Sequence, residues 1–148
     1  MIIAIGSDHA GYFAKEAEKA FLAEIGIEVL DMGCFSEESV HYPVYAELVA
    51  KAINEGKAER GVLICGTGLG MSIVANRFPG IRATVCHDTF TAKASREHND
   101  SNILVMGARV VSEELMKLIT EIWLNAKFLG GRHTIRLEMI DAIDKKKR

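Results

Sequence analysis

The sequence predicts an α/β fold, namely a doubly wound three-layer sandwich in which a five-stranded parallel sheet carries helices on both faces. Two observations predict it. Short apolar runs alternate along the chain with longer segments of helical period, as in sheets built from right-handed β-α-β crossovers. In addition, 49% of the 148 residues are hydrophobic, which is enough to form one core. We therefore expect a single Rossmann-like domain, residues 1–148, with strand order 2-1-3-4-5.

Five runs rich in isoleucine, valine and leucine predict the strands. The first run is far too short for a signal peptide or a membrane span and has no basic segment before it, so we interpret it as a buried strand of a cytoplasmic protein. The expected strands are residues 2–5, 28–31, 61–64, 82–86 and 103–106.

Amphipathic segments between these runs predict the helices. The first places Phe13, Ala17, Phe21 and Ile25 on one side and ends at Gly26, and glycine commonly follows the end of a helix. The second begins after Pro43 and stops at Gly56. Later helices are expected at residues 69–77, 89–98, 112–127 and 134–146.

The charge balance and the cysteine count exclude several functional classes. With 18 basic and 20 acidic residues, the chain has no field that would favour nucleic acid or an anionic membrane surface. Three cysteines, Cys34, Cys65 and Cys86, leave an odd thiol, and none has the close spacing of a zinc or redox site. We expect reduced thiols, no metal site, and structural roles for Cys34 and Cys86.

Ligands of such sheets bind at the carboxyl ends of the strands. Asp8 and His9 follow the first predicted strand, and Cys65 ends the third and precedes a glycine-rich loop at residues 66–70. Most free cysteines are small buried hydrophobes. Here the backbone N–H groups of the loop and of the next helix would favour a thiolate and bind an anion. Cys65 is therefore the candidate nucleophile or base.

The glycine loop has two other interpretations. Its glycines do not have the G-x-G-x-x-G spacing of a dinucleotide site and follow the third strand, although Asp88 lies where a ribose contact would be expected, so a nucleotide-binding hypothesis stays open. A cysteine phosphatase would need an arginine six positions after its nucleophile. Met71 occupies that position, which excludes the phosphatase.

Two further segments carry chemically useful side chains. His98 and Asn99 close a predicted helix, where Asn99 could be a left-handed cap or His98 a proton shuttle. Arg132 and Arg136 are four residues apart on one helix face and suit a phosphate, or else form a solvated basic face. The other side of that last helix is apolar and could dock on a partner subunit, carrying the arginines into its site.

Five segments taken together resemble the type B ribose-5-phosphate isomerases, whose relatives include the galactose-6-phosphate isomerase subunits. The resemblance spans essentially the whole chain. One branch of this family has a glutamate base at the position of Met71, so the thiol branch is implied here. The segments are residues 6–11 (GSDHAG), 40–43 (VHYP), 65–70 (CGTGLG), 95–100 (SREHND) and 130–133 (GGRH).

The resemblance implies a metal-free aldose–ketose isomerase without a cofactor, acting on ribose 5-phosphate through a cis-enediolate. It also implies a homodimer, which could pair into tetramers, with sites at the subunit interface. Cys65 would move the proton between C1 and C2, Thr67 would help to move protons at the oxygens, and His98 would open the sugar ring. The implied substrate-binding residues are Asp8, His9, Tyr42, Gly66, Gly68, Leu69, Gly70, Asn99, Arg109, Arg132 and Arg136.

Two alternatives remain at this point. One is a hexose-phosphate isomerase acting on allose 6-phosphate or galactose 6-phosphate, because the sequence does not reveal the depth of the pocket. The other is a non-catalytic nucleotide-binding module, supported by the glycine loop and Asp88.

Overall fold

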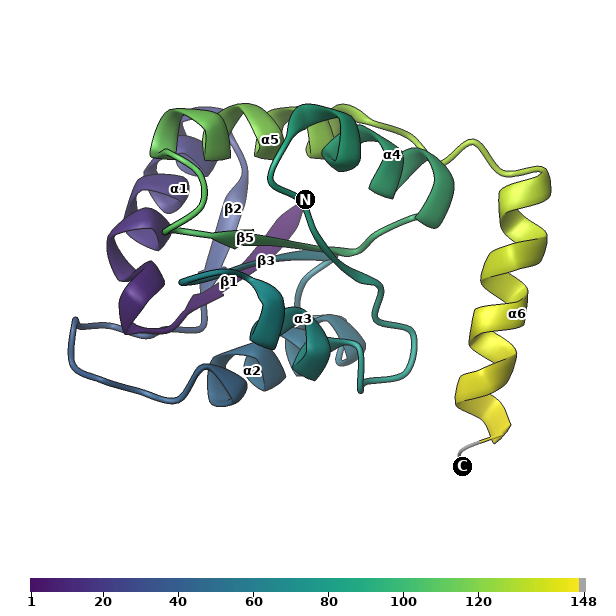
Figure 1. Cartoon of the computed structure of the whole chain (residues 1–148), viewed down its shortest axis with the longest axis horizontal. Helices are drawn as coiled ribbons and strands as arrows, with labels where there is room; N and C mark the ends of the chain where they lie inside the picture. The colour runs from purple at the N-terminus through teal and green to yellow at the C-terminus, as the bar shows by residue number, and fades with distance from the viewer. Residues whose placement is uncertain (147–148) are drawn as a thin grey trace.

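The computed structural model describes residues 1–146, and in them a five-stranded, all-parallel sheet lies between two helical layers (Figure 1). The last two residues of the predicted domain, 147–148, lie outside the described residues. The strands are β1 (Ile2–Ser7), β2 (Glu28–Asp31), β3 (Arg60–Cys65), β4 (Ala83–Val85) and β5 (Ile103–Gly107). The helices are η1 (His9–Gly11), α1 (Tyr12–Glu24), α2 (Tyr42–Asn54), α3 (Leu69–Ala75), α4 (Thr89–Asn99), α5 (Glu113–Asn125) and α6 (Arg132–Lys146).

The predicted strand order 2-1-3-4-5 is wrong, because the sheet runs β2-β1-β3-β5-β4. β5 pairs with β3 from Gly61↔Ile103 to Cys65↔Gly107, and β4 lies at the edge. The reason is burial. All five residues of β5 are buried, whereas two of the three residues of β4 are only half-buried. A strand that is apolar on both faces gains most in the interior of a parallel sheet, and a short strand suits an edge.

Alternate residues of the strands point into two separate cores. Ile3, Ile5 and Ile64 face α1, α4 and α5, while Ala4 and Leu63 face α2 and α3. Figure 1 shows the same division, with α1, α4 and α5 on one side of the sheet and α2 and α3 on the other. The doubly wound architecture is therefore as predicted.

The buried face of α1 is not the one that the apolar residues predicted. Phe13 is 61% exposed, whereas Lys15 and Glu18 are almost completely buried. Both buried ionisable groups have partners from other elements: Asp31 accepts hydrogen bonds from Lys15, and Thr120 donates one to Glu18. A pattern based only on hydrophobicity cannot detect such pairs, which is why the predicted face was displaced.

The helix α6 stands beside the two layers rather than within them (Figure 1). It begins at Arg132, two residues earlier than predicted, and buries His133 and Leu137. Ile135, Met139 and Ile143 are more than half exposed. No helix within residues 1–146 is both long and apolar enough to span a membrane.

Candidate active site

A cavity of about 350 Å³ opens at the carboxyl ends of β1, β3 and β5. This is the edge at which a parallel sheet is expected to hold its ligand. It brings together most of the predicted residues that follow these strands, together with the first residue of α2. Its lining consists of Asp8, His9, Ala10, Tyr42, Cys65, Gly66, Thr67, Gly70 and Arg109.

The thiol of Cys65 lies at the floor of this cavity, at the end of β3. The side chain is 5% exposed, and its Sγ accepts a hydrogen bond from the backbone N–H of Gly68 at 3.1 Å. Gly68 has φ of +82°, a left-handed conformation that glycine adopts without strain and that turns its N–H back toward the sulfur. The sulfur is therefore held as a hydrogen-bond acceptor at the carboxyl end of β3. The following helix α3 has only seven residues, so this direct bond, rather than a helix dipole, is the main interaction.

The ring of Tyr42 packs against the glycine loop at Gly70. A Cβ at Gly70 would lie 2.5 Å from Cζ of the Tyr42 ring, so only glycine lets the ring approach this closely. Thr67 is exposed on the loop, and its Oγ1 accepts a weak hydrogen bond from the N–H of Leu69 at 3.4 Å. The cavity therefore contains the hydroxyl of Thr67 from the loop and the phenol of Tyr42 from α2, together with the thiol. Leu69 itself is 59% exposed and does not line the cavity.

Asp8 and His9 have their orientations fixed by local hydrogen bonds. Asp8 is buried and accepts a bond from the N–H of Gly11 at 3.1 Å, which caps η1. The Nδ1 atom of His9 accepts a bond from the N–H of Val40 at 3.2 Å. A neutral His9 ring therefore carries its proton on Nε2, which makes that atom a donor at the cavity.

Arg109 supplies a positive charge to the same edge of the sheet. Its guanidinium passes over Gly66, and its backbone N–H donates to the carbonyl oxygen of Gly66 at 3.0 Å. The side chain is exposed and lines the cavity. A guanidinium in this position can form paired hydrogen bonds with a phosphate or carboxylate.

The predicted residues His98 and Asn99 lie far from this cavity, at the amino edge of the sheet. The segment after α4 is hydrogen-bonded to Arg82, the residue before β4. The backbone N–H of Arg82 donates to Oδ1 of Asn102, and the Nε atom of Arg82 donates to the carbonyl oxygen of Asp100. Asn99 lines a different hollow, with Leu137 of α6. Within one chain, therefore, His98 and Asn99 cannot meet a ligand of Cys65.

The end of α4 also differs from the predicted cap. The residue in the left-handed conformation is Asp100, with φ of 44°, and Asn99 is the last helical residue. This leaves the side chains of His98 and Asn99 exposed.

The arginines predicted to bind phosphate lie on α6 beside His98 rather than beside Cys65. His133, next to Arg132, stacks on His98 with ring centroids 4.5 Å apart and planes inclined by 10°. Burial lowers the pKa of His133, and His98, Arg132 and Arg136 lower it further. Arg132 and Arg136 are exposed. A second basic cluster thus lies at the other end of the molecule from Arg109.

Asp88, which supported the nucleotide-binding hypothesis, is engaged in a helix cap. Its Oδ1 accepts a hydrogen bond from the N–H of Thr91 at 2.7 Å, and this bond lowers the pKa of Asp88. The residue follows β4, the edge strand, which is not adjacent to β3. Asp88 therefore does not lie next to the glycine loop at the end of β3, as a ribose contact would require.

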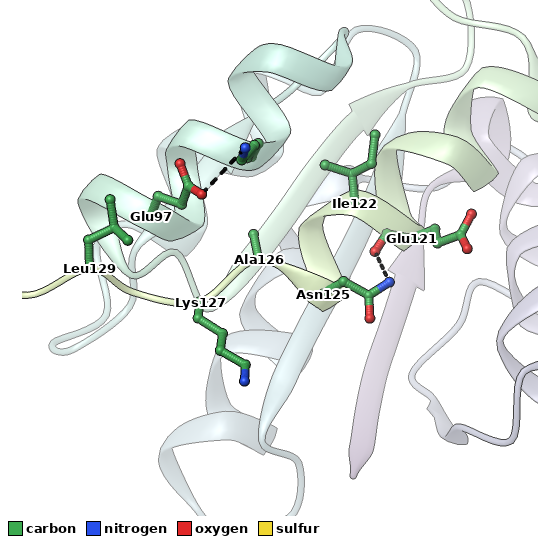
Figure 2. A pocket seen from close by; sticks show the side chains of 8 residues that line it. Glu97, Glu121, Ile122, Asn125, Ala126, Lys127 and Leu129 are labelled. Carbon is green, nitrogen blue, oxygen red and sulfur yellow. Dashed lines mark hydrogen bonds and ion pairs between the residues drawn. The ribbon is translucent and has the colours of Figure 1, made fainter.

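A larger hollow, about 460 Å³, lies between the end of α4 and the end of α5 (Figure 2). It contains none of the predicted site residues. Its side chains include Ile122, Ala126 and Leu129, with Glu97 and Lys127 at the rim. Its lining contains no thiol, hydroxyl or imidazole group, so its size alone does not make it the candidate active site.

Sequence reasoning missed two residues near these clusters. Ala10 lines the cavity, and only its position directly after Asp8 and His9 could have indicated it. His133 was not predicted to contact His98, because 34 residues separate them and only the packing of α6 on α4 brings them together. Among residues 1–146, no group of three or more His, Cys, Asp or Glu side chains is arranged to hold a metal ion.

The chain is similar in sequence to known proteins. Residues 3–140 match the family model described as Ribose/Galactose Isomerase. The chain is 50% identical over 145 residues to ribose-5-phosphate isomerase B of Escherichia coli (strain K12), covering 98% of this chain and 97% of that protein. It is 43% identical over 139 residues to D-erythrulose-4-phosphate isomerase of Pectobacterium atrosepticum, covering 93% and 91%.

A solved structure shows the same fold over the full length. The ribose-5-phosphate isomerase B of Clostridium thermocellum is 51% identical, and superposes with a TM-score of 0.99 over 100% of both chains.

Proposed function

The chain belongs to the ribose/galactose isomerase family and is an isomerase, and from this premise we propose that it interconverts D-ribose 5-phosphate and D-ribulose 5-phosphate through a cis-enediolate with Cys65 as base. The observation that carries the proposal is the thiol at the floor of the cavity, with the Gly68 N–H directed at its sulfur. The names of the E. coli and C. thermocellum relatives support the five-carbon substrate. The isomerase assignment also argues against a non-catalytic nucleotide-binding module.

In the proposed reaction, the Cys65 thiolate removes the proton from C2 of the open-chain aldose. The C2–H electrons form the C1–C2 double bond, and the carbonyl electrons move to the oxygen on C1, which gives the enediolate. The proton of the C2 hydroxyl moves to the oxygen on C1 with the help of Thr67, and the O–H electrons form the C2 carbonyl. The electrons of the C1–C2 double bond take the proton back from the Cys65 thiol at C1, which gives the ketone and regenerates the thiolate. Thr67 and the loop N–H groups donate hydrogen bonds to the oxygens as their charge changes, which is the usual role of preorganised donors.

Asp8, His9 and Tyr42 would hold the sugar hydroxyls. Asp8 is an acceptor and His9 Nε2 a donor, so together they suit hydroxyl groups, which both donate and accept. Arg109 lies at the rim, where an exposed guanidinium suits the charged phosphate end of the substrate.

We further propose that the site is completed by a second copy of the chain. His98, Asn99, Arg132 and Arg136 are on the opposite edge of the sheet from Cys65, and the exposed apolar side chains of α6 need a partner surface. In a symmetric homodimer each chain would place these residues against the cavity of the other. His98 would then open the sugar ring, Asn99 would hold a reacting oxygen, and the two arginines would bind phosphate.

Replacement of Cys65 tests the proposed base. We expect Cys65→Ala to reduce kcat for ribulose 5-phosphate formation by about 10³-fold, because a positioned general base contributes on the order of 10²- to 10⁴-fold to the rate. Cys34→Ala is the matched control, since Cys34 is buried outside the cavity and binds the carbonyl oxygen of Ser36. It should retain activity. Turnover of Cys65→Ala at the wild-type rate without added metal would exclude the thiol base.

The length of the sugar is tested in the same assay. The similarity to a D-erythrulose-4-phosphate isomerase and the family description, which includes galactose, make four- and six-carbon sugars the relevant competitors. We expect kcat/KM to be highest for ribose 5-phosphate in a panel with erythrulose 4-phosphate, allose 6-phosphate and galactose 6-phosphate. A higher value for another sugar would replace the proposed substrate and leave the isomerase chemistry intact.

A further inference from the structure

His87 lies between β4 and α4 and belongs to none of the clusters described above. Its Nε2 atom accepts a hydrogen bond from the backbone N–H of Gly107 at 3.0 Å. Gly107 is the last residue of β5 and is buried. A half-buried histidine thus hydrogen-bonds to the end of β5, the interior strand that adjoins β3.

The side chain of His87 takes the place of a backbone acceptor on β4. β4 pairs with β5 only as far as Val85↔Val105, and the N–H of Cys86 then donates to the carbonyl oxygen of Val105 at 3.0 Å. Beyond this point the chain turns into α4, so its backbone no longer offers an acceptor in register. A buried N–H without an acceptor is costly, and the imidazole of His87 satisfies that of Gly107.

The loop after Cys65 also packs directly against Gly107. A Cβ at Gly107 would lie 2.8 Å from Cα of Thr67, so the two backbones are in direct contact. The residues after Gly107 bind the same loop: the N–H of Ala108 donates to the carbonyl oxygen of Cys65 at 2.8 Å, and the N–H of Arg109 donates to that of Gly66 at 3.0 Å. The position of Gly107 therefore sets the positions of the thiol, of Thr67 and of Arg109 relative to one another.

We propose that His87 is a positioning residue for the candidate active site, acting through Gly107 on the Cys65 loop and on Arg109. The hydrogen bond requires an unprotonated Nε2, so the neutral ring carries its proton on Nδ1. The structural part of this proposal does not depend on the substrate. Only its kinetic consequence rests on the proposed function.

Two variants separate the hydrogen bond from the bulk of the side chain. In His87→Gln, Oε1 is four bonds from Cα, as Nε2 is in histidine, and it can accept the Gly107 bond. In His87→Asn the acceptor is one bond too short. Both side chains are uncharged and polar, so the pair differs mainly in reach, and circular dichroism with thermal unfolding verifies that each variant is folded.

Residue-resolved amide hydrogen exchange by NMR is the first measurement. In wild type and His87→Gln we expect protected N–H groups at Gly107, Gly68, Ala108 and Arg109. In His87→Asn exchange should be on the order of tenfold faster or more at all four. A merely local structural role would accelerate Gly107 alone, and that result would overturn the proposal. In the wild type, ¹⁵N shifts should show an unprotonated Nε2 on His87, and a protonated Nε2 would also overturn it.

Kinetics with ribose 5-phosphate is the second measurement. His87→Asn should lower kcat on the order of tenfold with little change in KM, because misplacing reacting groups weakens the chemical step. His87→Gln should restore most of kcat. Failure of both variants to the same extent would overturn the proposal. If the exchange pattern is as expected but even the wild type does not isomerise the sugar, the proposed function fails and the positioning role of His87 stands.

Discussion

The three cysteines show how environment differentiates one residue type. Cys65 accepts a backbone hydrogen bond at the floor of a cavity, whereas Cys34 donates to the carbonyl oxygen of Ser36 at 3.3 Å. Burial raises the pKa of Cys86, which keeps that thiol protonated. All three side chains are buried and free, so burial alone does not distinguish the proposed base, Cys65. The hydrogen bond from the Gly68 N–H to its sulfur does.

Glu18 gives a pH-dependent prediction at the same scale. Burial raises its pKa from 4.5 to about 7, although a hydrogen bond from Thr120 opposes the shift, and its Oε1 has no hydrogen-bond partner within residues 1–146. The folded protein therefore binds this proton more tightly than the unfolded chain. The free energy of unfolding should fall as pH rises from about 4.5 to about 7, by a total of roughly 3 kcal/mol, and the loss should be complete above that range.

The variant Glu18→Gln isolates this contribution. Gln is uncharged at every pH, so the variant should gain stability relative to wild type as pH rises through this window. Urea unfolding at pH 5, 6, 7 and 8, at one protein concentration, measures the difference. A difference that does not change with pH would show that Glu18 does not titrate as expected.

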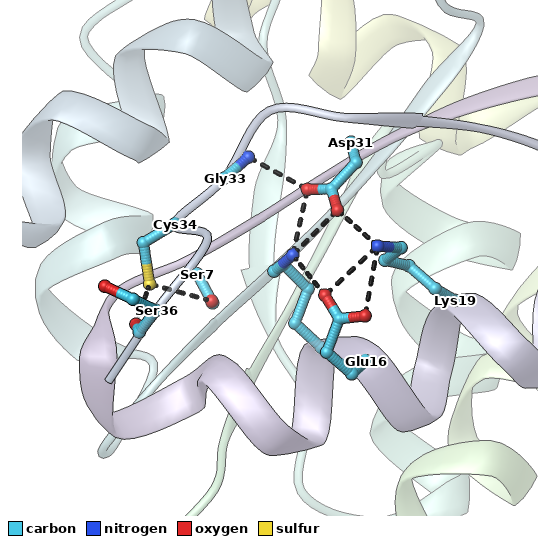
Figure 3. Close-up of polar contacts among 8 residues, drawn as sticks. Ser7, Glu16, Lys19, Asp31, Gly33, Cys34 and Ser36 are labelled. Carbon is cyan, nitrogen blue, oxygen red and sulfur yellow. Dashed lines mark hydrogen bonds and ion pairs between the residues drawn. The ribbon is translucent and has the colours of Figure 1, made fainter. Parts of the chain in front are cut away.

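At the scale of elements, a buried ion network fixes Gly33, near the start of the segment that leads to Tyr42. Lys15 of α1 is fully buried, and its Nζ donates to both carboxylate oxygens of Asp31 at 2.9 and 2.8 Å. Asp31 also accepts the N–H of Gly33 at 2.9 Å (Figure 3). The carbonyl oxygen of Gly33 in turn accepts the N–H of Ser7 at 2.7 Å. Although burial raises the pKa of Asp31, the bonds from Lys15, Lys19 and Gly33 hold it below its ordinary value.

Removing the carboxylate should therefore be costly. Asp31→Asn removes the carboxylate that pairs with both Lys15 and Lys19 and leaves the buried Lys15 ammonium paired with Glu16. We expect it to lower the free energy of unfolding by about 3 kcal/mol, as for other broken buried pairs. Lys51→Ala is the matched control, because its pair with Glu47 lies on the exposed face of α2. Chemical denaturation should show a large loss for Asp31→Asn and almost none for Lys51→Ala. Equal losses would mean that burial of the network contributes nothing.

At the scale of the whole molecule, the two clusters on opposite edges of the sheet predict complementation. Cys65→Ala and His98→Asn should each be nearly inactive alone. When they are mixed under conditions that exchange subunits, half of the dimers are hybrids, and in each hybrid one of the two sites is intact. Recovery of about a quarter of wild-type activity is therefore expected for a site shared between symmetry-related chains. No recovery, with subunit exchange verified by mass spectrometry, would show that the two residues serve the same chain's site.

Several features of the fold and site followed from local sequence. The alternation of apolar runs and amphipathic segments predicted the parallel sheet, and Asp8, His9 and Cys65 were predicted to face one crevice because they follow strands. The structure brings these three together. The order of the last two strands was predicted wrongly, since both runs are apolar and only the extent of burial on their two faces distinguishes the interior strand β5 from the edge strand β4.

The sequence by itself determined the class of fold and the residues at the carboxyl ends of its strands, because hydrophobic period and glycine placement are local properties of the chain. Only the tertiary structure decided that β5 lies beside β3, that Lys15 and Glu18 point inward, that His87 supports Gly107, and that His98 lies away from Cys65. These outcomes depend on which distant groups satisfy each other's hydrogen bonds and charges. Tertiary packing determines which of these distant groups pair, and a local sequence pattern cannot predict the pairing.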